Sequence, residues 1–207
     1  QSNRAAPHVG GLLGHDGTPP GELYDLARRQ VSAYPAVGLR DEVATGARID
    51  GDRFIVSLSG TEGEIRTRAL VLATGLDYEV PDVPGFAELW GGAVFHCPFC
   101  HGWDVRDRRV AVYAPAEAST RLATLLAAWT DEVIAVDPGD IARARIDDGA
   151  LRALVRHDGE EVACDAVLVH APLRPRGQLP QDLALTLTED GFIAVDREMH
   201  TSVPGVY

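Results

Sequence analysis

Two cysteines separated by two residues, Cys97 and Cys100, form the pattern in this sequence with the clearest chemical meaning. A pair at this spacing can close a small disulfide ring, because a thiolate attacks a neighbouring disulfide and later leaves again as a thiolate. His96 and His101 flank the pair. Imidazoles titrate near neutral pH, where they accept or supply the protons that such an exchange requires. Residues 96–101 therefore indicate a two-electron redox centre.

The same residues allow two other interpretations. Two cysteines and two histidines can ligate zinc, but a zinc site needs four ligands in tetrahedral arrangement. Adjacent side chains such as His96 and Cys97 rarely converge on one ion, so we expect no metal here. The pair could also be two ordinary buried thiols. Cys164, the third cysteine, lies in the apolar stretch 162–169, which predicts an inert core thiol.

The overall composition argues against several classes of partner. The chain has 207 residues, of which 19 are basic and 31 acidic, and its formal net charge is −12. This acidic balance argues against nucleic acid and against an anionic membrane surface. No apolar stretch reaches the length of a membrane span. Three cysteines do not make a secreted disulfide framework, so we expect a cytoplasmic protein.

The segments before the cysteine pair predict a helix, then alternating strands with a turn, then a strand that is buried on both faces. These are residues 18–34, residues 54–58 with a turn at 60–63, and residues 69–73.

The segments after the pair predict a βαβ unit followed by further strands. The unit comprises a strand at 110–113, a helical stripe at 122–129 and a strand at 133–136; the further strands are 151–155, 162–169 and 191–196.

These elements, in this order, resemble the low-molecular-weight thioredoxin reductase family of flavoproteins. The matching segments are residues 70–75, the Val-Pro-Gly at 83–85, the cysteine pair before a βαβ unit, and residues 191–195 and 201–207. The sequence Cys-Pro-Phe-Cys-His-Gly is particularly similar to the branch of dithiol oxidases that form disulfides in microbial natural products. Such enzymes pass electrons from a substrate dithiol through the cysteine pair to FAD and then to oxygen.

The resemblance implies an α/β protein with two Rossmann-like dinucleotide-binding domains, in which the cysteine-bearing domain is inserted into the FAD domain. The implied boundaries are residues 1–84 and 191–207 for an incomplete FAD domain, and 85–190 for the inserted NAD(P)-binding-like domain. The family's GxGxxG turn and its Ala-x-Gly-Asp motif, which hold FAD, would fall outside this sequence. The family also implies a homodimer.

The resemblance assigns roles to individual residues. Cys100 would lie against the flavin and Cys97 would exchange with substrate. His101 occupies the place of an aspartate that serves as general acid in thioredoxin reductases. Residues 9–17 would pass near the flavin, because glycines permit close backbone approach to a flat ring. The implied FAD contacts are Thr74, Gly75, Gly11 and His15.

The βαβ unit departs from the family at the positions that would bind NADPH. A nicotinamide-binding turn needs glycines so that the backbone can approach the pyrophosphate, whereas residues 114–118 read Ala-Pro-Ala-Glu-Ala. Residues 137–140, where users of NADPH carry a basic cluster, read Asp-Pro-Gly-Asp. These residues argue against NADPH as the electron donor.

The expected function is therefore that of a flavin-dependent enzyme acting on sulfur, a dithiol oxidase that forms a disulfide in a small substrate with oxygen as acceptor. Two alternatives remain open. One is an NADPH-dependent disulfide reductase acting on a thioredoxin-like protein. The other is a degenerate flavoprotein that serves as a binding module without turnover.

Overall fold

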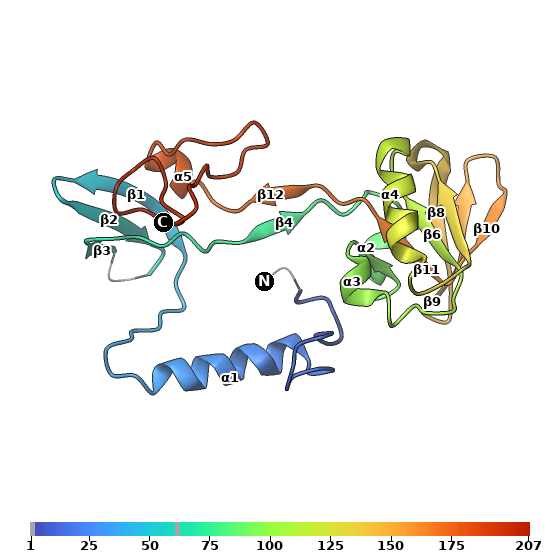
Figure 1. Ribbon diagram of the computed structural model, residues 1–207, viewed down its shortest axis with the longest axis horizontal. Helices are drawn as coiled ribbons and strands as arrows, with labels where there is room; N and C mark the ends of the chain where they lie inside the picture. Colours follow the sequence, from blue (N-terminus) through green and yellow to red (C-terminus); the bar gives the residue numbers. More distant parts are fainter. Residues whose placement is uncertain (1–2, 61–62) are drawn as a thin grey trace. The chain divides into compact units, whose positions relative to one another are not determined.

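The computed structural model describes residues 3–60 and 63–207 and divides the chain into two compact units (Figure 1). Unit 1 contains residues 1–31 and 78–172, and unit 2 contains residues 32–77 and 173–207. The main part of unit 1 is thus an insertion between the two segments of unit 2. The cysteine pair belongs to unit 1.

This division differs from the domain boundaries that we expected at residues 84, 85, 190 and 191. Val83 and Phe86 are 8% and 0% exposed and belong to the core of unit 1, so the proline-rich crossing is part of that unit. Leu183 and Leu185 pack with Phe54 in the core of unit 2. Residues 1–31 lie with the cysteine unit instead of with residues 32–77.

Unit 1 is built on a four-stranded parallel sheet in the order β5-β11-β6-β7, next to a three-stranded antiparallel sheet in the order β10-β9-β8. Its elements are α1 (Pro20–Ser32), α2 (Phe86–Leu89), β5 (Val94–Phe95), α3 (Pro98–His101), β6 (Val110–Tyr113), α4 (Ala116–Leu126), β7 (Val133–Val136), η1 (Pro138–Asp140), β8 (Ile141–Asp147), β9 (Ala150–Arg156), β10 (Glu161–Ala163) and β11 (Ala166–Val169).

The two faces of the parallel sheet are covered by different layers. Val110 and Val112 of β6 pack in one cluster with α4, whereas Ala111 and Tyr113 pack in another with β8 and β9. This alternation follows from the two-residue period of a strand, and all four residues of β6 are buried because both faces are covered.

The predicted βαβ unit is confirmed: β6 and β7 are parallel, with Val110 opposite Val133, and α4 connects them. The strand predicted at 151–155 is also present as part of β9. The single strand predicted at 162–169 is wrong. Residues 161–163 pair antiparallel with β9, whereas 166–169 pair parallel with β6, so Cys164 lies where the chain passes between two sheets.

The predicted first helix is confirmed as α1, which begins at Pro20, one residue after the expected first position, and ends at Ser32 before Pro35. Its 13 residues are mostly exposed. Within the described part of the chain, no helix combines the length and apolarity needed to cross a bilayer.

Unit 2 carries a three-stranded antiparallel sheet, β1-β2-β3, whose middle strand is the one predicted at 54–58. The predicted turn at 60–63 includes Thr61 and Glu62, which lie outside the described residues. The elements are β1 (Ala44–Asp50), β2 (Arg53–Leu58), β3 (Glu64–Thr67), β4 (Leu76–Tyr78), β12 (Leu173–Pro175) and α5 (Leu179–Asp182). β4 pairs with β12, and its last residue, Tyr78, is the first residue of the second segment of unit 1.

Two strands predicted for unit 2 are not formed. Residues 69–73 make an isolated parallel bridge between Leu70 and Val206, and Val71 is 77% exposed. Residues 191–196 make only the bridge between Leu187 and Ile193. A strand buried on both faces needs paired neighbours and covering layers. Within the described part of unit 2, Leu70 makes one bridge, so the apolar residues 69–73 are only partly buried.

Candidate active site

The cysteine pair lies at the start of a short helix that follows β5. Cys97 is the residue before α3, and Pro98 occupies the first helical position, where its missing N–H costs nothing. The backbone amides of Cys100 and His101 each donate to the carbonyl oxygen of Cys97, at 3.2 Å. All three cysteines are free thiols; Cys97 is half-buried and Cys100 exposed, whereas Cys164 is buried. Sequence and local hydrogen bonding thus hold the pair on one helical turn.

The environment of Cys100 favours its protonated form. Partial burial of the thiol, a hydrogen bond with Cys97 and the charge that Cys97 can carry raise the pKa of Cys100 to about 12. Cys100 therefore keeps its proton at neutral pH when the pair is reduced. When Cys100 leaves a disulfide as a thiolate, a nearby group must supply that proton.

The two ring nitrogens of His101 differ in their hydrogen bonding. Its Nε2 lies 3.0 Å from the carbonyl oxygen of Gly91, which only accepts hydrogen bonds, so Nε2 carries the proton. Its Nδ1 is buried, and none of the described residues offers it a hydrogen-bond partner. The ring stacks on Phe95, with centroids 5.4 Å apart. His101 thus presents a fixed ring with an unused acceptor nitrogen.

His96 lies in an aromatic stack. Its ring centroid is 3.8 Å from that of Tyr78 and 5.7 Å from that of Trp90. Burial, and then the charge of His101, lower the pKa of His96, so its imidazole is neutral at neutral pH. Burial and the charges of Cys97 and Cys100 raise the pKa of Tyr78, so its phenol keeps its proton.

A third histidine comes from the segment before α1. The Nε2 of His8 lies 3.2 Å from Oδ2 of Asp104, which follows Cys100 by four residues. The Nδ1 of His8 is buried, and the described residues give it no hydrogen-bond partner. Asp104 and Tyr78 had no sequence pattern that marked them, because their place beside the cysteines depends on the turn after α3 and on the strand β4.

Two cavities of unit 1 meet Cys100. The Tyr78 cavity measures about 190 Å³ and is lined by Tyr78, Trp90, His96, His101, His8 and Cys100, among others. The Trp103 cavity measures about 520 Å³ and is lined by Gly10, Gly11, Trp103, Asp104, His8 and Cys100, among others. Cys100 and His8 thus line both cavities.

The loop at Gly10 and Gly11 packs against α3 and borders the Trp103 cavity beside Cys100, where the ring of the expected flavin would have to lie. The backbone at Gly10 passes so close to α3 that a Cβ there would lie 3.2 Å from the carbonyl oxygen of Cys100. Gly11 has a φ of 72° and its amide donates to Oδ1 of Asp16 at 2.8 Å, which keeps this loop narrow. The Trp103 cavity between loop and helix lies within the usual size range for small-molecule sites.

The structure groups some of the sequence-predicted residues and separates others. Cys97, Cys100 and His101 share α3 and its preceding residue, and Gly11 lines the Trp103 cavity with Cys100. His15 lines a separate depression along α1, together with Thr18 and Leu23. Thr74 and Gly75 are exposed residues of unit 2. The roles assigned to all seven residues remain predictions.

The turn between β6 and α4 lacks the glycines of a nicotinamide-binding turn. Pro115 precedes α4 and has no amide hydrogen, and its carbonyl oxygen accepts from the amides of Ala118 and Ser119. Glu117 lies in the first turn of α4. After β7, the carboxylate of Asp137 accepts from the amide of Gly139 at 2.8 Å, so an acidic side chain fixes this turn.

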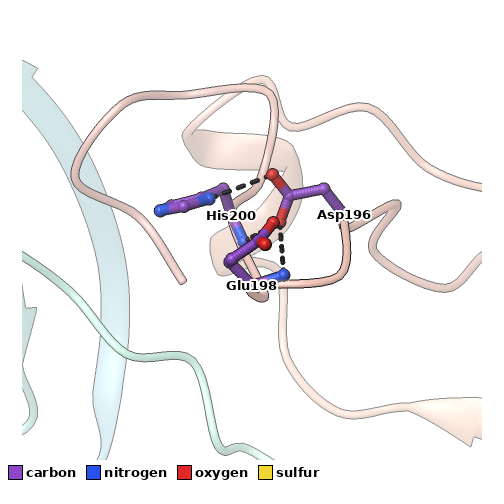
Figure 2. A group of neighbouring side chains, drawn as sticks. All are labelled: Asp196, Glu198 and His200. Atoms are coloured by element: carbon purple, nitrogen blue, oxygen red, sulfur yellow. Dashed lines mark hydrogen bonds and ion pairs between the residues drawn. The ribbon is translucent and has the colours of Figure 1, made fainter.

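A third group of polar side chains lies in unit 2, where Asp196, Glu198 and His200 surround one turn (Figure 2). Among the described residues, they are the only group of three or more His, Cys, Asp or Glu side chains whose potential metal-ligand atoms all lie within 4.8 Å of one another. Oδ1 of Asp196 accepts from the amides of Glu198 and His200, and Oδ2 lies 3.0 Å from Nδ1 of His200. The Asp196 carboxylate is therefore used to close the turn, and all three residues are exposed.

Comparisons with known proteins place the chain in a family. The family model described as "Pyridine nucleotide-disulphide oxidoreductase" matches residues 123–207. The thioredoxin reductase of Listeria innocua is 25% identical over 246 residues, covering 95% of this chain and 76% of that protein. The crystal structure of HlmI is 33% identical with a TM-score of 0.88, covering 100% of this chain and 72% of that chain.

The fold over the whole chain is the α/β fold of solved thioredoxin reductases. The thioredoxin reductase of Streptococcus pyogenes has a TM-score of 0.84 at 17% identity, covering 99% of this chain and 75% of that chain. A curated "Probable thioredoxin reductase" of Arthroderma benhamiae is 29% identical over 118 residues, which is 55% of this chain but 29% of that protein. The chain belongs to the thioredoxin reductase-like pyridine nucleotide-disulphide oxidoreductases.

Proposed function

We propose that this chain carries the thiol–disulfide centre of an FAD-dependent dithiol oxidase, which oxidises a small dithiol and uses oxygen as the final acceptor. The observation that carries the proposal is the grouping of a free cysteine pair with His101, whose buried Nδ1 has no hydrogen-bond partner among the described residues and which lines a cavity with Cys100. Thiol–disulfide exchange requires a group that accepts the thiol proton, and an imidazole on the same short helix can serve as that group.

The chemistry consists of two exchanges. In the first, a substrate thiol loses its proton to His101 and attacks Cys97 in the oxidised pair; the Cys97–Cys100 bond breaks and Cys100 leaves. In the second, the other substrate thiol loses its proton and attacks the mixed disulfide, so the substrate disulfide forms and Cys97 leaves. Two electrons and two protons pass from the substrate dithiol to the cysteine pair.

The cysteine pair must then be reoxidised. A bound FAD would supply the two-electron acceptor for the reduced pair and a route for these electrons to oxygen, which would be released as hydrogen peroxide. The residues that would hold its ring are Gly10 and Gly11, with Cys100 opposite them. Thr74 and Gly75 remain proposed contacts to the rest of the cofactor.

We prefer the oxidase over the NADPH-dependent reductase because of the turn between β6 and α4. Pro115 removes an amide that would face a pyrophosphate, and Glu117 and Asp137 place carboxyl groups near the expected phosphate positions. The runner-up, a disulfide reductase that takes electrons from NADPH, is supported by the parallel βαβ unit itself, which is the framework of a dinucleotide site.

The deciding experiment mixes the full-length, flavin-loaded protein anaerobically with either a small dithiol or NADPH. We expect the flavin absorbance to fall with the dithiol and to persist with NADPH, and admitted air to restore it with one hydrogen peroxide per disulfide. Rapid reduction by NADPH would establish the reductase instead. Unchanged flavin absorbance with both reagents would favour a binding module without turnover. Cys164→Ala is the matched control for Cys97→Ser, because only Cys97→Ser should abolish the reaction.

A further inference from the structure

We propose that His8, oriented by Asp104, is a second acid–base residue of the site and delivers the proton that Cys100 takes up when it leaves the disulfide. The inference rests on the proposed thiol–disulfide function and adds a residue to it. The His8–Asp104 pair is independent of His101, because it comes from the segment before α1 and from the turn after α3.

The geometry of His8 is that of an oriented acid–base group. Its Nε2 is 3.2 Å from the Asp104 carboxylate, an arrangement that favours a proton on Nε2 and leaves Nδ1 as the nitrogen that exchanges protons. Nδ1 is buried, and the described residues leave it without a hydrogen-bond partner. A buried polar atom without a partner is costly, so such an atom at a cavity wall points to a reacting group that completes it.

The position of His8 matches the sulfur that needs a proton. His8 and Cys100 line both cavities, whereas His101 lines the Tyr78 cavity. His8 is therefore the histidine that lines the Trp103 cavity together with Cys100.

Two exchanges move two protons, and the site offers two imidazoles with unused nitrogens. His101 accepts the proton of the attacking substrate thiol, and His8 in its protonated form donates to Cys100 as the S–S bond breaks. In the second exchange His8 is reprotonated by the second substrate thiol, and the leaving Cys97 takes up the proton that His101 accepted in the first exchange. Each exchange breaks one S–S bond and forms one, and no other oxidant or reductant enters this half-reaction.

Other titratable groups share the two cavities with His8. The titratable groups facing it are Asp104, Cys100, His101, His96, Tyr78 and Asp16. Of these, Asp104 is the carboxylate in direct contact with the ring. Removing this carboxylate takes away the group that orients the His8 ring and favours a proton on Nε2.

The test measures thiol–disulfide exchange on the full chain without flavin. The protein is oxidised to the Cys97–Cys100 disulfide, mixed with dithiothreitol between pH 5 and pH 9, and quenched with an alkylating reagent; mass spectrometry counts the released thiols. We expect His8→Gln to slow exchange by roughly 10²-fold, the usual scale of acid–base catalysis, with the largest loss on the acidic side. Asp104→Asn should lose less of the rate than His8→Gln, because it keeps the imidazole and removes only the carboxylate that orients it.

The matched control is His200→Gln, which removes a histidine that also contacts an aspartate, at 3.0 Å, but lies in unit 2. This variant should exchange at the wild-type rate. A His8→Gln chain with wild-type rate and pH profile would overturn the proposal. An equal loss at every pH in both His8→Gln and Asp104→Asn would also overturn it, because it would indicate a structural role. Failure to form the Cys97–Cys100 disulfide at all would contradict the proposed function instead.

Discussion

Nε2 of His101 lies 3.0 Å from the carbonyl oxygen of Gly91, and this contact selects the nitrogen that can take part in chemistry. Because a carbonyl oxygen cannot donate, Nε2 must, and the lone pair is left on Nδ1. Gly91 has a φ of 86°, and a Cβ there would lie 2.5 Å from the backbone of Ala5. Gly91 therefore orients the His101 ring through its carbonyl oxygen and also packs against the segment before α1.

Replacement of His101 tests its role as base. His101→Ala should slow flavin reduction by a dithiol ~10²-fold or more, because the substrate thiol loses its proton acceptor. His101→Asp should keep part of the rate, since a carboxylate can also accept a proton. The measurement is anaerobic stopped-flow absorbance of the full-length protein. Wild-type rates in His101→Ala at every pH would leave this histidine a purely structural residue.

The raised pKa of Cys100 predicts its pattern of alkylation. Although Cys100 is the exposed cysteine, its pKa of about 12 keeps it protonated at pH 8, and only the thiolate reacts. We expect the labelling rate of Cys100 to rise about tenfold per pH unit up to that value. Cys97→Ser should speed labelling of Cys100 at pH 8, because it removes the sulfur whose hydrogen bond and charge raise the pKa of Cys100. Peptide mass mapping after timed labelling gives both rates, and a rate independent of pH would contradict the prediction.

Substitution of Gly91 tests how residues 3–10 pack against the cysteine unit. Gly91→Ala should destabilise the chain by about 1–3 kcal/mol beyond its backbone strain, because the new methyl group would clash with Ala5. Protease cleavage before α1 should become faster. The control is Gly149→Ala, where φ is 73° but no atom lies within 4 Å of the new Cβ. Equal melting temperatures and cleavage rates for the two variants would show that this segment is not packed as described.

We expect the buried thiol of Cys164 to make the protein less stable in alkali. Burial raises the pKa of Cys164 to about 11 in the folded chain, above its usual value near 9. Between these values the folded state binds more protons than the unfolded state, so the free energy of unfolding falls as pH rises, by about 2–3 kcal/mol in all. Cys164→Ala should flatten this slope. Chemical denaturation at pH 8 and pH 11 checks it, and an unchanged slope would assign the effect to other groups.

We expect the half-buried imidazole of His96 to make the protein less stable in acid. Burial lowers the pKa of His96 in the folded chain, so as pH falls below its usual value the unfolded state binds the proton first and the free energy of unfolding decreases. His96→Phe keeps a ring between Tyr78 and Trp90 but cannot be protonated. We expect its unfolding free energy to depend less on pH between pH 7 and pH 5. A dependence as steep as that of the wild type would contradict this assignment.

The sequence by itself determined the βαβ unit and the cysteine pair. Residues 110–113 form the predicted strand because they are apolar on every position and lie between a helix layer and a sheet layer. Cys97 and Cys100 fall on one turn because their spacing and Pro98 favour a helix start. Both features are local, and local spacing fixes them.

Only the tertiary structure decided which other side chains reach the cysteines. Asp104 meets His8, although 96 positions separate them in the printed sequence, and Tyr78 reaches His96 through a stack that no periodicity reveals. The strand predicted at 69–73 failed for the opposite reason: its apolar residues favour burial, but burial requires neighbouring strands, and the one bridge to Val206 leaves Val71 exposed. Residue types thus determine what a segment can do, whereas contacts between distant segments determine which of those possibilities the fold uses.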